Sequence, residues 1–143
     1  MPAEFLPPPT ILVVDDEPVI NLLITRYFTH RGYRVLAASS GEEALELVRR
    51  RQPPVDLVLS DVIMPGMDGR ELAAKVLEEV PGPMVLLMTG QLPGELDRVI
   101  LRHHIVRIVH KPLDLDRLAA LLASLLPPLP PADDDRESPR RIG

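Results

Sequence analysis

The chain of 143 residues has no cysteine and no tryptophan, and it has no long apolar run. Without cysteine there are no disulfide bonds, no thiolate metal ligands and no cysteine nucleophile. No run reaches the roughly 18 consecutive apolar residues that a membrane span requires, and residues 1–10 lack the basic start and apolar centre of a secretory signal. We therefore expect a cytoplasmic protein with no membrane segment and no thiol chemistry.

Positive charge and aromatic side chains are also scarce. The net charge is −5, and aromatic residues make up 3% of the sequence. Affinity for nucleic acid comes from Lys and Arg that neutralise phosphates, and single strands need aromatic rings on which their bases stack. The composition therefore predicts an aliphatic core and no nucleic-acid partner.

Proline, by contrast, is abundant and concentrated at the two ends of the chain. Of the 17 prolines, nine lie within residues 1–9 and 127–143. The apolar content of 45% is enough to fill the core of one domain in a chain of this length. We predict a flexible proline-rich extension over residues 1–9, one domain over 10–126, and a proline-rich, charged, disordered tail over 127–143.

Within the predicted domain, short strand-like runs alternate with longer runs of helical period, which is typical of βαβ units and a parallel sheet. Five strands are predicted: Ile11–Val14, Arg34–Ala37, Asp56–Ser60, Met84–Met88 and Val106–His110. Four helices have recognisable start signals at Pro18, Ser40, Asp68 and Asp114, and a shorter helix is expected around Leu96–His103. The first helix is expected to carry one apolar face, formed by Val19, Leu22, Leu23 and Tyr27.

Charged residues follow three of the predicted strands. Asp15 and Asp16 follow the first strand, Asp61 the third and Lys111 the fifth. The carboxyl ends of parallel strands meet at one edge of a sheet, so these side chains are expected to lie together. Three neighbouring carboxylates repel one another and call for a cation, and oxygen ligands favour Mg²⁺. A carboxylate in such a site can attack phosphorus and form an aspartyl phosphate.

Four segments resemble the receiver domains of bacterial two-component response regulators. They are ILVVDDEP, LVLSDVIMPGMDG, MTG and HKP. Their key residues are Asp16, Asp61, Thr89 and Lys111, which follow one another at steps of 45, 28 and 22 positions. The segments GRELAAKVLEEV and KPLDLDRL are similar to receivers at the end of hybrid kinases, although a free single-domain regulator fits equally well. The resemblance implies an α/β, flavodoxin-like (βα)5 fold, a doubly wound parallel five-stranded sheet with strand order 2-1-3-4-5.

The resemblance also implies a phosphorelay function. Asp61 would accept a phosphoryl group from a sensor histidine kinase or a histidine phosphotransfer protein. Asp16 and Asp61 would bind Mg²⁺ with their side chains, Ile63 with its backbone carbonyl, and Asp15 through a metal-bound water. This assignment agrees with the way phosphoryl transfer is catalysed, by positioning and by neutralising oxygens with a metal and cations.

Three further residues would respond to the phosphoryl group. The resemblance implies that Lys111 is a fixed cation and that Thr89 donates its hydroxyl to a phosphoryl oxygen. Gly90 would leave space beside Thr89. The movement of Thr89 would switch the surface that an unknown downstream protein binds. We expect no DNA-binding output domain, and a weak homodimer through the last helix stays open.

Two positions depart from the receiver pattern. Ile108 stands where many receivers have an aromatic residue, so an aromatic rotamer switch is excluded. We therefore hypothesise that the output surface relies more on the loop Thr89–Gly94 than on the fifth strand. The side chain of Ile63, two residues after the expected phosphoacceptor, cannot orient a water molecule, whereas Gln91 retains that ability.

Two other functions remain open from the sequence. One is a Mg²⁺-dependent phosphatase or phosphotransferase with an aspartyl nucleophile, but such enzymes usually have a second acid where this chain has Ile63, and no insertion is long enough for a substrate cap. The other is a phosphate-independent adaptor, which the complete set of charged residues disfavours. We expect a protein that is not an enzyme beyond its own phosphorylation and autodephosphorylation.

Overall fold

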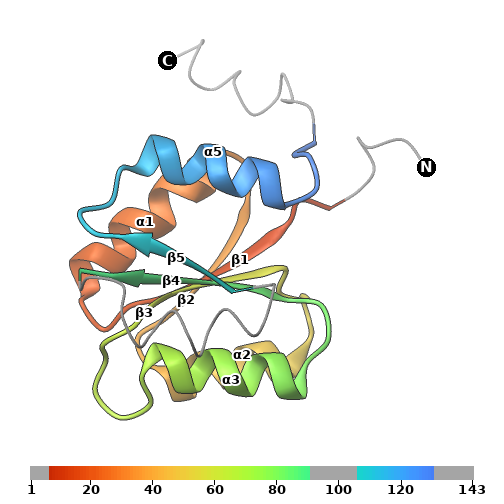
Figure 1. Ribbon diagram of the computed structural model, residues 1–143. Helices are drawn as coiled ribbons and strands as arrows, with labels where there is room; N and C mark the ends of the chain where they lie inside the picture. Colours follow the sequence, from red (N-terminus) through yellow and green to blue (C-terminus); the bar gives the residue numbers. More distant parts are fainter. Residues whose placement is uncertain (1–6, 91–105, 131–143) are drawn as a thin grey trace.

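The computed structural model describes residues 7–90 and 106–130, which form a single five-stranded sheet with helices on both faces (Figure 1). The strands are β1 (Thr10–Val14), β2 (Arg34–Ala38), β3 (Leu57–Asp61), β4 (Met84–Thr89) and β5 (Val106–His110). All neighbouring strands are parallel, and their order is β2-β1-β3-β4-β5. This arrangement confirms the predicted α/β, doubly wound sheet.

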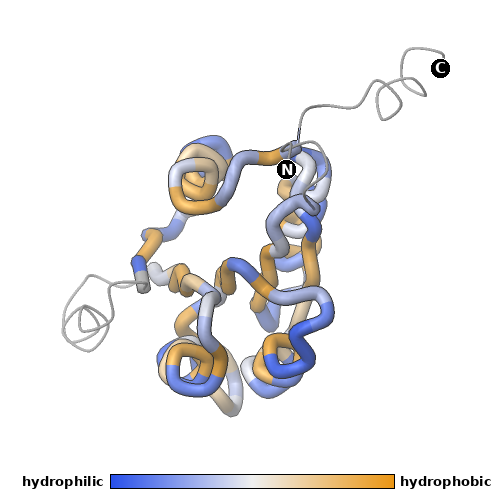
Figure 2. Tube along the Cα trace, turned by 90° about the vertical axis from the view of Figure 1, so that its right-hand side faces the viewer, coloured by the Kyte–Doolittle hydropathy of each residue, from blue (hydrophilic) through white to orange (hydrophobic). Residues whose placement is uncertain are grey.

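Two pairs of helices cover the sheet. The helices are α1 (Pro18–His30), α2 (Gly41–Arg50), α3 (Gly69–Glu79) and α5 (Leu115–Leu125). Helices α1 and α5 pack on one face and α2 and α3 on the other, and Figure 2 shows both layers from a second direction. The helix expected around Leu96–His103, and with it Gln91, lies outside the described residues.

The sheet separates two apolar cores. Along β1, Ile11 and Val13 point toward α1 and α5, whereas Leu12 and Val14 point toward α2 and α3. This division follows from the pleat, which directs successive side chains to opposite faces. Strands β1 and β3 are buried along their whole length, and so is β4 after its first residue. Their nearly unbroken apolar sequences are therefore those of strands covered on both sides.

Three of the predicted helix starts are real N-caps. Ser40 Oγ accepts a hydrogen bond from the Glu43 N–H at 3.1 Å, and Asp68 Oδ1 accepts from two backbone N–H groups at 2.9 Å. Asp114 caps α5 in the same way. Each such cap satisfies N–H groups that have no partner inside the helix and stabilises it by about 1 kcal/mol.

The predicted apolar face of α1 is wrong. Val19, Leu22 and Leu23 are 77%, 50% and 55% exposed. The side chains that α1 buries are instead those of Asn21, Ile24 and Phe28. The helix carries apolar residues around most of its circumference, so their spacing does not select one face. The buried face is chosen by contacts with β1 and β2, which include a polar residue.

Proline segments meet at the edge of the sheet where the strands begin. Pro7–Pro9, Pro53–Pro54 and Pro127–Pro128 line a hollow of about 270 Å³. The Thr10 N–H donates to Asp56 Oδ2 at 2.7 Å beside it. The described ends of the chain therefore lie at the edge opposite the carboxyl ends of the strands (Figure 1). No helix in the described ranges has the length and apolar character needed to cross a membrane.

Candidate functional site

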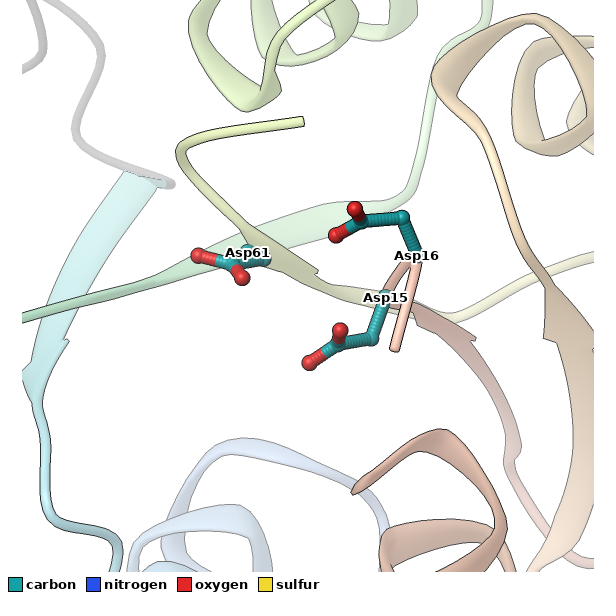
Figure 3. A group of neighbouring side chains, drawn as sticks. All are labelled: Asp15, Asp16 and Asp61. Atoms are coloured by element: carbon teal, nitrogen blue, oxygen red, sulfur yellow. The ribbon is translucent and has the colours of Figure 1, made fainter. Parts of the chain in front are cut away.

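The charged strand ends meet at the carboxyl edge of the sheet, as their spacing predicted. Asp15 and Asp16 follow β1, and Asp61 ends β3. One carboxylate oxygen of each residue lies within 4.8 Å of the others. Figure 3 shows the three carboxyl groups gathered around one space between the ends of β1 and β3. These oxygens are close enough together to coordinate one cation.

Lys111 brings a positive charge to the same site. Its Nζ donates to Asp61 Oδ2 at 3.1 Å, and the Asp61 side chain is 10% exposed. The Lys111 backbone N–H donates to the Thr89 carbonyl at 2.8 Å, which continues the pairing of β4 with β5 beyond the end of the strands. The position of the ammonium group is thus set partly by the sheet, and its hydrogen bond to Asp61 is strengthened by both charges.

Asp15 is the most deeply buried member of the cluster, with 1% of its surface exposed. Its Oδ1 accepts the Glu17 N–H at 2.8 Å, but its Oδ2 is buried and has no hydrogen-bond partner among the described residues. Burial raises the pKa of the Asp15 carboxyl, the Glu17 N–H opposes that shift, and the charge of Asp61 adds to it. A buried carboxylate oxygen without a donor is costly, and a hard cation would satisfy it. The residues present therefore fit Mg²⁺.

The loop after Asp61 is held close to the end of β3. The Val62 N–H donates to the Met88 carbonyl at 3.0 Å, and the Gly69 N–H donates to the Val62 carbonyl at 2.7 Å. A Cβ atom on Gly69 would lie 2.3 Å from the Asp61 carbonyl oxygen, so only glycine fits there without movement. Ile63 lies in this loop with a side chain that is 61% exposed.

The remaining predicted residues lie on β4 and β5. Thr89 is the buried last residue of β4 and pairs with His110 in the sheet, while Ile108 is partly buried against the core under α2 and α3. A Cβ atom on Gly90 would meet no described atom within 4 Å. The part of the loop Thr89–Gly94 that begins at residue 91 lies outside the described residues.

One residue that contacts the site was not predicted. Asn21 is buried on α1, and its Nδ2 donates to the Asp15 carbonyl at 3.1 Å. The only local signal is a polar residue inside an apolar helical run, and this does not reveal a contact with the preceding strand.

The family model of the response regulator receiver domain matches residues 11–123. The chain belongs to this family, which confirms the resemblance drawn from its four motifs. The match begins in β1 and ends in α5, so it includes every strand end that contributes to the site.

Individual relatives agree with this assignment. Sporulation initiation phosphotransferase F of Bacillus subtilis (strain 168) is 36% identical over 121 residues, which cover 82% of this chain and 93% of that protein. The chain spans only 29% of the length of two transcriptional regulatory proteins of Escherichia coli, GlrR and QseF, to which it is 34% identical.

Solved structures show the same fold. The receiver domain from the hybrid histidine kinase CckA is 33% identical, with a TM-score of 0.70, and the alignment covers 82% of this chain and 99% of that one. The CheX-CheY-BeF3-Mg²⁺ complex from Borrelia burgdorferi contains a chain that aligns with a TM-score of 0.73 and 26% identity, covering 82% and 88% of the two chains.

Proposed function

We propose that this chain is the phosphoacceptor of a two-component phosphorelay, and that Asp61 takes the phosphoryl group. The observation that carries the proposal is the Asp61 carboxylate, which lies between an acid pair and the Lys111 ammonium, 3.1 Å away. An Asp61 oxygen attacks phosphorus, the P–N bond to the donor histidine breaks, and the electron pair stays with the imidazole nitrogen. The donor is a sensor histidine kinase or a histidine phosphotransfer protein.

The acid cluster holds Mg²⁺ in this proposal. Asp16 and Asp61 bind the ion with their side chains, Ile63 with its backbone carbonyl, and Asp15 through a bound water. Two observations support this assignment: Asp15 Oδ2 has no partner among the described residues, and the related complex from Borrelia burgdorferi contains Mg²⁺. Bound Mg²⁺ supplies positive charge for the phosphoryl oxygens, which is the main requirement of phosphoryl transfer.

Three residues that end or follow β4 and β5 respond to the phosphoryl group. Lys111 keeps its charge beside the new phosphate oxygens, and Thr89 turns its hydroxyl toward one of them. Gly90 places no side chain next to Thr89, and a Cβ atom there would meet no described atom within 4 Å. Ile108 takes no part as an aromatic switch, since its aliphatic side chain packs against the core. The altered surface near Thr89 is then the one that a downstream protein binds.

The surroundings of the site favour a protein as phosphoryl donor. Large apolar side chains are exposed on α1, which begins shortly after Asp16, and in the loop that follows Asp61. They are Val19, Leu22, Leu23 and Ile63. Exposed apolar side chains near a site of this kind are typical of protein contact surfaces. A small-metabolite phosphatase would not require them.

The proposal includes the organisation of the chain and its setting. Residues 10–126 form the receiver domain, and proline-rich segments flank it at 1–9 and 127–143. The protein acts in the cytoplasm, contacts no nucleic acid, and changes only its own phosphorylation state. A weak homodimer through α5 remains a prediction.

Intact mass spectrometry tests the proposal. The protein is incubated with Mg²⁺ and either acetyl phosphate or phosphoramidate, and we expect one added phosphoryl group that disappears with EDTA or in the Asp61→Asn variant. Glu17→Gln removes an exposed neighbouring acid and serves as the matched control, which should be phosphorylated normally. No mass gain with either donor would favour a phosphate-independent adaptor, and repeated turnover of a phosphomonoester would favour the phosphatase.

A further inference from the structure

The buried face of α1 carries a polar residue that joins the ends of two strands. Asn21 is 8% exposed, and its Nδ2 donates to the Ala38 carbonyl at 2.8 Å and to the Asp15 carbonyl at 3.1 Å. Ala38 is the last residue of β2, and Asp15 directly follows β1. One amide group therefore ties the backbone of the acid pair to the neighbouring strand.

A second residue of α1 helps to hold this amide in place. The Thr25 Oγ1 hydroxyl donates to Asn21 Oδ1 at 3.2 Å, one helical turn further along. If the Asn21 amide were reversed, its oxygen would face two carbonyl oxygens and its nitrogen would face the hydroxyl. The observed orientation satisfies all three contacts: the two carbonyl groups select it, and the hydrogen bond from the Thr25 hydroxyl helps to hold it.

Packing alone does not require an amide at this position. A hollow of about 420 Å³ lies beside Asn21, Thr25 and Ala38, and its walls are largely apolar. A larger apolar side chain has room there, and leucine favours a helix more than asparagine does. An apolar residue, however, cannot donate the two hydrogen bonds to the Asp15 and Ala38 carbonyl groups at the strand ends.

These contacts act on the two acids through the backbone. The Asp15 carbonyl belongs to the peptide group between Asp15 and Asp16, so holding it limits rotation at both residues. The Asp15 N–H is held as well, because it donates to the Ala38 carbonyl at 3.2 Å. We propose that Asn21, supported by Thr25, is a positioning residue that fixes Asp15 and Asp16 in the geometry that binds the metal. This inference rests on the Mg²⁺ site proposed above.

Direct titration with MgCl2 tests the inference without any phosphorylation step. The amide ¹H–¹⁵N shifts of Asp16 and Asp61 are followed in the full chain and in Asn21→Ala. Loss of a group that orients metal ligands typically weakens metal binding about 10- to 100-fold. We expect the dissociation constant for Mg²⁺ to rise by at least about tenfold in Asn21→Ala. If the unaltered protein shows no Mg²⁺-dependent shift, the proposed metal site itself is refuted.

A matched variant separates positioning from loss of stability. Phe28→Leu removes buried apolar volume from the same helix, where Phe28 is fully buried, but it lies about two turns beyond Asn21 and further from the acid pair. It should lower the thermal midpoint and leave the Mg²⁺ affinity unchanged. If Asn21→Ala lowers the midpoint yet binds Mg²⁺ as the unaltered protein does, the positioning role is refuted.

Variants of Thr25 keep the inference testable if Asn21→Ala does not fold. Thr25→Ser retains the hydroxyl that supports the amide, whereas Thr25→Val keeps the shape and loses it. We expect normal Mg²⁺ affinity in the serine variant and weaker binding in the valine variant. Equal affinities in these two variants would overturn the inference.

Discussion

Replacing Asp15 by asparagine is predicted to stabilise the protein in the absence of metal. The substitution keeps the shape of the side chain and the Oδ1 atom that accepts the Glu17 N–H. It removes one of three neighbouring negative charges and replaces a buried oxygen that has no described partner by an NH2 group. That group can donate to the carboxylates around it, so the lost charge and the new hydrogen bonds both favour the variant.

The distances set the size of the effect. Carboxylate oxygens within 4.8 Å of one another repel by at least about 3 kcal/mol per pair at an effective dielectric near 20. The Lys111 ammonium and the solvent around the exposed Asp16 offset much of this repulsion. We expect Asp15→Asn to raise the free energy of unfolding by about 1–2 kcal/mol, which raises the thermal midpoint by about 3–8 °C.

Magnesium should reduce the difference in stability between the two proteins. A ligand that binds only the folded state at ten times its dissociation constant stabilises it by about 1.4 kcal/mol. The unaltered protein should gain this stability, whereas Asp15→Asn should gain less because one acid is lost from the site. Urea unfolding followed by circular dichroism, with EDTA and with MgCl2, measures both effects.

A matched control tests whether repulsion within the acid cluster lowers the stability of the fold. Glu17→Gln removes an exposed acid next to the cluster and should change stability by less than about 0.5 kcal/mol. If Asp15→Asn unfolds at lower urea than the unaltered protein in EDTA, repulsion within the cluster does not destabilise the fold, and the reasoning fails.

Three further predictions concern other parts of the structure. Gly69→Ala should destabilise the protein by about 1–3 kcal/mol and slow phosphorylation, because its Cβ would lie 2.3 Å from the Asp61 carbonyl oxygen. Gly82→Ala strains only its own backbone, at φ +112, and should be phosphorylated normally. Urea unfolding and intact mass spectrometry compare the two variants. Lys111→Met keeps the apolar stem but loses the hydrogen bond to Asp61. The phosphorylation rate should therefore fall by about 100-fold or more at saturating Mg²⁺. An unchanged rate would contradict the role of the ammonium group. Burial raises the pKa of Tyr33, so the folded protein holds the phenol proton more tightly than the unfolded chain does. The free energy of unfolding should therefore fall as the pH rises above about 10. In urea titrations at alkaline pH, Tyr33→Phe should show a smaller loss of stability.

The sheet could be predicted from the sequence because its central strands are buried on both faces. The predicted Ile11–Val14 and Met84–Met88 each fall within one residue of the ends of β1 and β4, and the predicted third strand is shifted by a single residue relative to Leu57–Asp61. An apolar run of this kind is typical of a central strand that helices cover on both faces, so its local sequence is sufficient to predict the strand. The meeting of the charged strand ends follows from that sheet alone.

Contacts between distant segments could not be predicted in the same way. The sequence indicates that Lys111 and Asp61 lie near each other, but not that Nζ donates to Oδ2, nor that Asp15 Oδ2 is left without a described donor. The inner face of α1 was mispredicted for a related reason. Asn21 is buried because its partners are carbonyl groups at the ends of β1 and β2, and no spacing within α1 records those partners.

The proline hollow at the start of the strands has a practical consequence for handling the protein. Pro7–Pro9 and Pro127–Pro128 both line it, so the chain enters and leaves the described fold on the side away from Asp61. An affinity tag, a fluorescent dye or a surface linker attached beyond either segment would be anchored there. Protein immobilised through either end would turn the Asp15, Asp16 and Asp61 cluster away from the support, which suits binding measurements on a sensor chip.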